Sequence, residues 1–260
     1  MNAAPRFADL APRLASGGVM AALGIAGVWA GGLIFAVMVA ALCGAMMWEL
    51  MRMLHPAPPG HALGEGVGAA LSLLLVTTFL DPPAALAVMP VLAVALTWHG
   101  PQHRPVRTGY AAVILLAGLG LIVLRDSYGW EWVLWLVLVV IGSDVAGYFA
   151  GRLIGGPKLW PRVSPKKTWS GTVAGWAVAL GIGAAMLGPL GAGPGLLVAS
   201  VLLCMAGQAG DIAESAVKRM VGVKDSSTLI PGHGGALDRF DAMIAAALMA
   251  LLLAAAGVLD

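Results

Sequence analysis

A succession of long apolar runs constrains the fold of this chain more than any other feature. Hydrophobic residues make up 60% of its 260 residues and charged residues only 11%, too few charges to cover the surface of a water-soluble globular protein. Runs of this kind are typical of membrane-spanning helices, because a helix satisfies its own backbone hydrogen bonds in lipid. The sequence therefore predicts an all-α fold, a polytopic transmembrane helical bundle.

The apolar runs predict about nine spans, and the basic residues predict their orientation. The expected ranges are 16–32, 33–51, 64–80, 83–98, 109–124, 130–151, 171–190, 194–213 and 241–258. If the N-terminus is cytosolic, every Lys and Arg except Arg125 falls on the cytosolic side. Because cytosolic loops of membrane proteins are enriched in Lys and Arg, we expect a multi-pass protein of the cell (inner) membrane with a cytosolic N-terminus.

Polar residues divide the chain into two parts. Residues 1–140 contain few of them, so we expect an N-terminal transmembrane scaffold in which Glu49 is a helix-end anchor. Residues 141–260 are rich in polar side chains on the cytosolic side, which predicts a C-terminal transmembrane catalytic region. Cys43 and Cys204 lie inside apolar runs, and we interpret them as ordinary buried residues and not as a disulfide or a metal site.

The densest polar stretch runs from Asp211 to Asp241, between two apolar runs. Charged groups at such a position are costly and usually mark a site. Asp211, Glu214, Ser215 and Lys218 would share one face of a helix. The site should therefore face the cytosolic end of the bundle.

A glycine-rich segment and two further carboxylates complete this stretch. Pro231 to Gly235 cannot be helical, and the glycines around His233 would let backbone N–H groups approach a ligand closely. Asp238 and Asp241 begin the last helix, where negative charge is favoured. Carboxylates from two helix ends around a basic loop favour Mg²⁺ with a polyphosphate. A zinc site is disfavoured because only His233 could supply nitrogen.

Two upstream segments add charge to the same side. In SDVAGYFAGR, Asp144 shares a helix face with Gly147, Tyr148 and Gly151, so it could hold a cation or contact a neighbouring helix. The loop 155–171 carries four basic residues and no acid. It suits lipid head groups or nucleotide phosphates, although the charge bias of cytosolic loops would also explain it.

The stretch SAVKRMVGVKDSSTLIPGHGGALDRFD closely resembles the signature of the phosphatidate cytidylyltransferase (CDP-diacylglycerol synthase) family. That signature has the form S-x-x-K-R, four residues, K-D, then P-x-H-G-G-x-x-D-R-x-D. SDVAGYFAGR and SPKKTWSG are similar to two upstream motifs of the family, and three motifs in order over 143–241 make a specific match. Ala236 stands where the family usually has a larger aliphatic residue, and Ser170 where Glu is common.

The resemblance implies a Mg²⁺-dependent nucleotidyltransferase of phospholipid biosynthesis. Such an enzyme transfers the cytidylyl group of CTP to phosphatidate and releases CDP-diacylglycerol and pyrophosphate. The implied partners are CTP, phosphatidate and membrane lipid, with a homodimer in the membrane and no nucleic acid. The resemblance leaves open whether a second metal ion takes part.

Residue roles follow from the motifs and the chemistry together. We expect Asp211 and Asp238 to hold Mg²⁺, with Asp144 and Asp241 as nearby or second ligands. The expected catalytic residues are Asp211, Asp238, Lys218, Arg239 and His233. The expected substrate-binding residues are Lys166, Lys167, Ser215, Arg219, Lys224, Asp225, Gly234 and Gly235.

Other classes of protein remain as alternatives. An ion-coupled transporter could use Asp144 and Asp211 as an intramembrane cation pathway, but its polar residues would extend toward both faces and here they gather toward one. A CDP-alcohol phosphotransferase is excluded because its D-G-x-x-A-R motif is absent. A catalytically inactive relative that acts as a scaffold stays open.

Overall fold

The computed structural model describes residues 10–55 and 59–259, and nine α-helices lie in these ranges. The helices are α1 Leu10–Ala30, α2 Gly32–Leu54, α3 Pro59–Phe79, α4 Pro82–Leu96, α5 Arg104–Val123, α6 Trp130–Leu153, α7 Trp169–Leu190, α8 Gly195–Met220 and α9 Leu237–Ala255, and a π-helical turn η1 covers Leu124–Tyr128. The predicted helical bundle is therefore confirmed.

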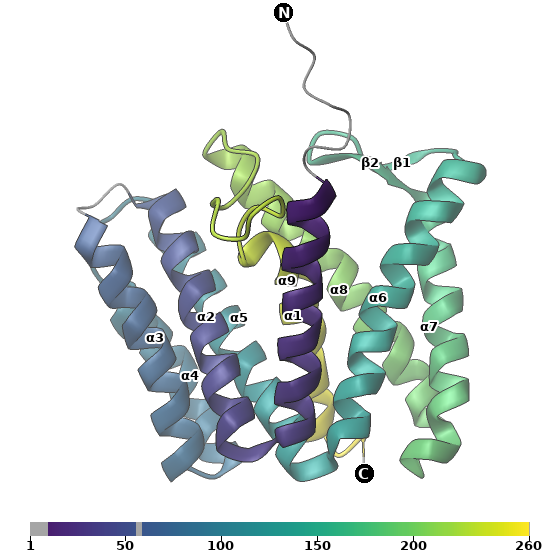
Figure 1. Cartoon of the computed structure of the whole chain (residues 1–260), viewed down its shortest axis with the longest axis horizontal. Coiled ribbons are helices and arrows are strands. Elements are labelled where there is room, and N and C mark those ends of the chain that lie inside the picture. The colour runs from purple at the N-terminus through teal and green to yellow at the C-terminus, as the bar shows by residue number, and fades with distance from the viewer. Residues whose placement is uncertain (1–9, 56–58, 260) are drawn as a thin grey trace, which may run out of the picture.

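The helices lie side by side and alternate in direction (Figure 1). The start of α1, a β-hairpin and the loop 221–236 between α8 and α9 lie at one end of the bundle, which we call the polar end. The C-terminal end of the described chain lies at the opposite end. Successive helices thus carry the chain back and forth along one direction, as a membrane bundle requires.

Within the part of the chain that the structure describes, seven helical segments are long and apolar enough to cross a membrane. They are α1, α2, α3, α5 together with η1, α6, α7 and α8. Of the two other helices, α4 has only 15 residues, and α9 has 19 residues with Asp238, Arg239 and Asp241 in its first turns. The chain is a multi-pass membrane protein, while nine crossings and a cytosolic N-terminus stay predictions.

The basic loop 155–171 is not wholly irregular, so the all-α prediction needs a correction here. Strands β1 Lys158–Trp160 and β2 Ser164–Thr168 pair antiparallel, with Lys158 opposite Thr168. Thr168 then caps α7, because its Oγ1 accepts the N–H of Gly171 at 3.2 Å and so satisfies one free helix donor. The hairpin therefore fixes where the adjacent lysines lie.

The glycines of SDVAGYFAGR allow close helix packing, as predicted. A Cβ atom on Gly171 of α7 would lie 2.6 Å from the carbonyl oxygen of Gly147 on α6, and one on Gly151 would lie 2.8 Å from Thr168 Oγ1. Small residues at such contacts let membrane helices approach. Tyr148 instead points outward, with 59% of its surface exposed.

Three residues outside the site also follow expectation in their surroundings. Cys43 and Cys204 are both buried free cysteines, as expected. Arg125, the lone basic residue predicted on the far side, donates from Nε to the carbonyl oxygen of Val28 at 2.6 Å and from Nη2 to that of Trp29 at 3.2 Å. Arg125 thus satisfies free carbonyl groups at the end of α1.

Candidate active site

The candidate site lies at the polar end, where α8 ends and α9 begins. Helix α8 extends to Met220, seven residues beyond the predicted apolar run, so Asp211 and Lys218 lie on this helix as expected. The two helices touch closely, since a Cβ atom on Gly210 would lie 2.6 Å from the carbonyl oxygen of Asp241. This contact brings Asp211 of α8 near Asp241 of α9.

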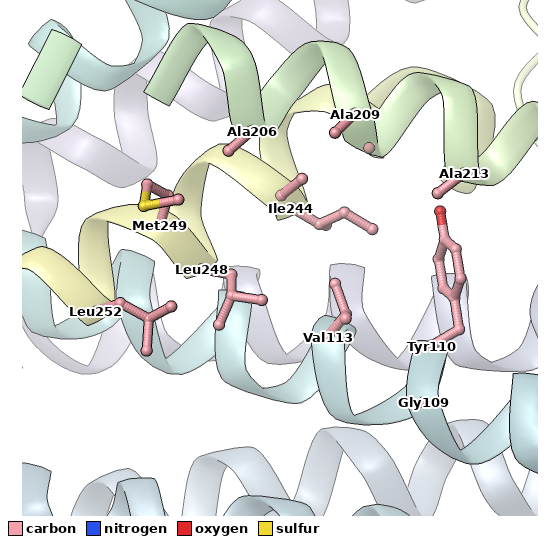
Figure 2. Close-up of a pocket in the computed structure, with 12 residues that line it drawn as sticks. Gly109, Tyr110, Val113, Ala206, Ala209, Ala213, Ile244, Leu248, Met249 and Leu252 are labelled. Atoms are coloured by element: carbon pink, nitrogen blue, oxygen red, sulfur yellow. The ribbon is translucent and has the colours of Figure 1, made fainter. Parts of the chain in front are cut away.

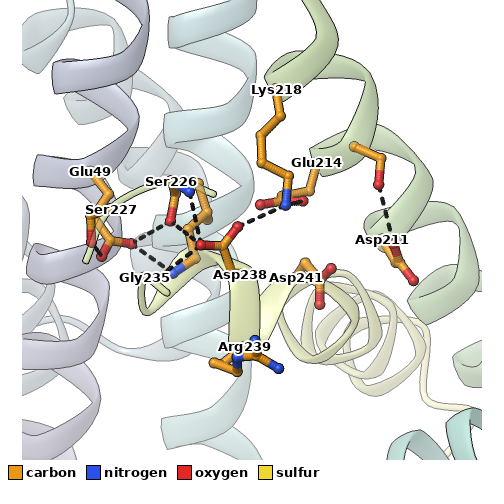
Figure 3. A network of polar contacts seen from close by, with 12 residues as sticks. Glu49, Asp211, Glu214, Lys218, Ser226, Ser227, Gly235, Asp238, Arg239 and Asp241 are labelled. Carbon is orange, nitrogen blue, oxygen red and sulfur yellow. Dashed lines mark hydrogen bonds and ion pairs between the residues drawn. The ribbon is translucent and has the colours of Figure 1, made fainter. Parts of the chain in front are cut away.

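Asp238 anchors the loop 221–236 (Figure 3). Its Oδ2 accepts hydrogen bonds from Ser226 N at 2.8 Å, Ser226 Oγ at 2.9 Å and Gly235 N at 2.8 Å. Its Oδ1 lies 2.7 Å from Lys218 Nζ, and Lys218 also pairs with Glu214 at 2.5 Å. Both Asp238 oxygens therefore have protein partners.

Glu49 of α2 reaches the same loop from the N-terminal half. It is fully buried, and it accepts hydrogen bonds from Ser227 Oγ at 2.6 Å, Ser226 Oγ at 3.2 Å, Ala236 N at 2.9 Å and Leu237 N at 2.7 Å. Because the last two donors are free N–H groups at the start of α9, Glu49 caps that helix from another part of the chain. We call Glu49, Glu214, Lys218, Ser226, Ser227, Gly235 and Asp238 the loop network.

The interpretation of Glu49 as an anchor at the end of its own helix was wrong, because the residue lies inside α2 and binds the start of α9. Its partners are 177 to 188 positions away in the sequence, so no local pattern shows them. The available signal was the carboxylate itself, in an otherwise apolar run where an ionisable residue is costly.

The loop network explains why Gly235 is a glycine. A Cβ atom there would collide with Ser226 Oγ and would lie 2.5 Å from Glu49 Oε1. The neighbouring Gly234 has a φ angle of +82°, a left-handed conformation that favours glycine. The predicted substrate role of these glycines stays a prediction, and their contacts show a role in shaping the loop.

A second group of carboxylates comes from three helices. Asp144 of α6, Asp211 of α8 and Asp241 of α9 lie within electrostatic range of one another, and we call them the acidic trio. Asp211 Oδ2 pairs with Lys167 Nζ at 2.6 Å, and Ser215 Oγ lies 3.4 Å from Asp211 Oδ1. Since Lys167 belongs to β2, the hairpin delivers a cation to the trio.

His233 contacts the first helix, which the sequence did not indicate. Its Nδ1 lies 2.8 Å from Ser16 Oγ, and the same hydroxyl lies 3.0 Å from the carbonyl oxygen of Pro231. Arg239 Nε donates to the carbonyl oxygen of His233 at 2.6 Å. The start of α1 therefore covers this side of the loop, and a catalytic role for His233 stays a prediction.

Several basic side chains remain available for an anion. Lys166, Arg219 and Lys224 are exposed and form no ion pair with any described residue, and the guanidinium group of Arg239 is also exposed. Ser170, which departs from the family pattern, donates from Oγ to the carbonyl oxygen of Gly155 at 2.5 Å. Ser170 thus holds the base of the hairpin together.

Asp144 and Asp241 of the acidic trio fit Mg²⁺ better than Asp238 does, whereas Asp211 already contacts Lys167 through Oδ2 and Ser215 through Oδ1. Asp144 accepts no hydrogen bond from the described residues, and Asp241 uses only Oδ1, for Ala242 N at 2.7 Å. Asp238 could bind a metal only if Lys218 or another donor gave way. Within the described chain no three Asp, Glu, His or Cys side chains form a ready-made metal site, but Mg²⁺ commonly needs only one or two carboxylates together with substrate phosphates.

Fold and site together define a class: an integral membrane protein with carboxylates and exposed cations gathered at one end of its helices. Comparison with known proteins specifies the family. The model of the cytidylyltransferase family matches residues 11–256, and the chain belongs to this family.

Relatives in three bacterial genera are phosphatidate cytidylyltransferases. A phosphatidate cytidylyltransferase of Brucella suis biovar 1 (strain 1330) is 38% identical over 236 residues, which cover 87% of this chain and 86% of the relative. Phosphatidate cytidylyltransferases of Staphylococcus saprophyticus subsp. saprophyticus and of Bacillus subtilis (strain 168) are 41% and 40% identical over 136 and 123 residues, about half of each chain. These similarities give no support to the transporter alternative.

Proposed function

We propose that this protein transfers the cytidylyl group of CTP to phosphatidate, giving CDP-diacylglycerol and pyrophosphate. The observation that carries the proposal is the convergence of the acidic trio beside Lys167, in a chain that matches a phosphatidate cytidylyltransferase over 86% of that relative's length. Carboxylates and exposed cations at one end of the bundle suit a reaction between two phosphate-bearing substrates.

The reaction joins two anions. An oxygen of the lipid phosphate attacks the α-phosphorus of CTP and forms a new P–O bond, while the bond from that phosphorus to the β-phosphate oxygen breaks and pyrophosphate leaves. The lipid phosphate is already ionised near neutral pH, so the site need not supply a general base. The main task of the protein is to overcome charge repulsion and to align the two phosphates.

The exposed cations are suited to that task. Lys166, Arg219, Lys224 and Arg239 would hold the triphosphate and the lipid phosphate, while Lys218 keeps Asp238 and Glu214 in place. Mg²⁺, bound by the acidic trio, would neutralise phosphate charge at the reacting group. That Asp238 also binds the metal, and that a second metal ion takes part, are separate hypotheses.

The membrane arrangement completes the proposal. Nine helices would cross the inner membrane, with the N-terminus and the polar end in the cytosol, because all Lys and Arg residues but Arg125 would then fall on that side. We also propose that the protein is a homodimer, as the family resemblance implies.

The test uses purified protein in detergent with phosphatidate, Mg²⁺ and CTP labelled at either the α- or the γ-phosphate. We expect α-label in the lipid fraction and γ-label in pyrophosphate, with both transfers lost on chelation of Mg²⁺. Label from the γ-phosphate in lipid, or no labelled lipid under varied lipid and metal conditions, would refute the proposal.

A further inference from the structure

An apolar cavity of about 350 Å³ lies between α5, α8 and α9 (Figure 2). Its walls include Val113 of α5, Ala209 of α8, and Ile244 and Leu248 of α9. Helices α8 and α9 also carry the site, yet the loop network and the acidic trio do not use the cavity.

The hollow exists because α8 presents small residues to it. Ala206, Ala209, Gly210 and Ala213 all line the cavity, and their spacing places them on one face of the helix. Helices α5 and α8 each pack against α9 but contact one another little. Ala209 and Ala213 remain exposed in the structure, so the cavity is accessible.

Among the described residues that line the cavity, Tyr110 alone has a polar side chain. The residue is only 9% exposed, and its hydroxyl has no hydrogen-bond partner among the described residues. Figure 2 shows the hydroxyl pointing toward Ala213 at one end of the cavity. Since a buried hydroxyl without a partner is costly, this group points to a ligand that completes its hydrogen bonding.

The Tyr110 end of the cavity adjoins the candidate site. The tyrosine lies within electrostatic range of Glu214, Asp241 and Asp211. Away from that end the cavity follows α9 from Ile244 to Leu252, which corresponds to about 12 Å along a helix axis. A ligand that fits would therefore have a hydrogen-bond acceptor at the Tyr110 end and a long apolar part, and a phosphate head beyond the acceptor would need Mg²⁺ or the exposed cations of the site to offset these carboxylates.

We infer that this cavity holds one acyl chain of the lipid substrate, with the Tyr110 hydroxyl donating a hydrogen bond to an ester carbonyl oxygen. The inference rests on the proposed function, and it assigns an acyl-chain site and a lipid-selecting residue. Phosphatidate has the required order of groups: a phosphate for the exposed cations, an ester for Tyr110 and a hydrocarbon chain for the apolar walls. Apolar pockets with a few placed polar groups are typical of such sites.

The first test fills the cavity. Ala209→Phe should lower the ratio of kcat/KM for dioleoyl phosphatidate to that for dihexanoyl phosphatidate by about tenfold, because the longer chain loses its space. Ala185→Phe makes the same change at an exposed position of α7 outside the cavity and should leave the ratio unchanged. Equal ratios in the two variants would overturn the inference.

The second test removes only the hydroxyl. Tyr110→Phe should raise KM for phosphatidate about three- to tenfold and leave kcat and KM for CTP unchanged, since one uniform binding contact is lost. A fall in kcat with unchanged KM for the lipid would instead indicate a structural role and would contradict the hydrogen bond.

A third test does not depend on turnover. Phosphatidate with a photoreactive diazirine in one acyl chain should cross-link to the cavity segments of α5, α8 and α9, and Ala209→Phe should suppress the cross-links while Ala185→Phe retains them. Cross-links in the cavity of a protein that forms no CDP-diacylglycerol would refute the proposed function and keep the chain site. Turnover without cavity cross-links would refute the chain site alone.

Discussion

The carboxylates near the polar end differ in what occupies their oxygens. Glu49 and Asp238 each accept several hydrogen bonds from the loop 221–236 and the start of α9. Asp144 and Asp241 keep oxygens without protein donors among the described residues. The first pair is therefore suited to holding the loop and the second pair to binding a substrate or a metal.

Glu49→Gln should destabilise the protein by about 3 kcal/mol. Glutamine has one acceptor oxygen and its amide group would face N–H and O–H donors, so buried hydrogen bonds to a charged group are lost. Thermal unfolding in detergent and proteolysis of the loop 221–236 would measure the effect. Glu131→Gln, at a carboxylate for which the described residues provide no hydrogen-bond donor, is the matched control, and equal stability of the two variants would contradict the capping role.

Asp238→Asn should lower both stability and activity. The amide keeps the shape but loses one acceptor and the negative charge beside Lys218, which we expect to cost about 1–3 kcal/mol. Parallel measurement of the unfolding temperature and of CTP-dependent turnover would test this. A variant with normal stability and no turnover would instead favour a direct catalytic or metal-binding role for Asp238.

The positions of site residues could be predicted from the sequence where they depend on neighbours along the same helix. Asp211, Ser215 and Lys218 were placed on one helix by spacing alone, and α8 contains them. Glu49 was missed because its role depends on donors that meet it only after the bundle forms. The contact of His233 with Ser16 was missed for the same reason.

Among the elements, the contact between α8 and α9 positions the acidic trio. Gly210→Ala should lower the free energy of unfolding by about 1–3 kcal/mol and reduce activity, because the added methyl group would displace α8 from the backbone of α9 beside Asp211 and Asp241. Gly181→Ala in α7 is the control, since its Cβ would meet nothing within 4 Å and a gain of about 0.5–1 kcal/mol is expected from helix propensity. Equal thermal stability of both variants would contradict this packing argument.

Helices were predictable as elements because long apolar runs leave few alternatives in a membrane. The residues at which the helices end were harder to predict. Helix α8 continues through charged residues to Met220, since polar side chains there pair with residues of the site. The hairpin β1–β2 was missed because KLW and SPKKT are short and lack a clear apolar alternation.

At the scale of the whole molecule, we expect the polar end of the bundle to face the cytosol and the opposite end to face the exterior. In a cysteine-free background, Asp81→Cys between α3 and α4 should react with an impermeant maleimide in intact spheroplasts. Arg162→Cys in the hairpin, at the opposite end of the bundle (Figure 1), should react only after permeabilisation. The reverse pattern would overturn the proposed cytosolic orientation of the polar end.

The most direct test of the central claim compares Asp241→Asn with Asp126→Asn in CTP-dependent labelling of phosphatidate. Asp241 belongs to the acidic trio, whereas Asp126 is exposed in η1 at the opposite end of the bundle. We expect Asp241→Asn to lower kcat/KM about a hundredfold or more without a fall in the unfolding temperature, and Asp126→Asn to behave like the unaltered protein. Turnover of Asp241→Asn close to that of Asp126→Asn would contradict a role of the acidic trio in catalysis.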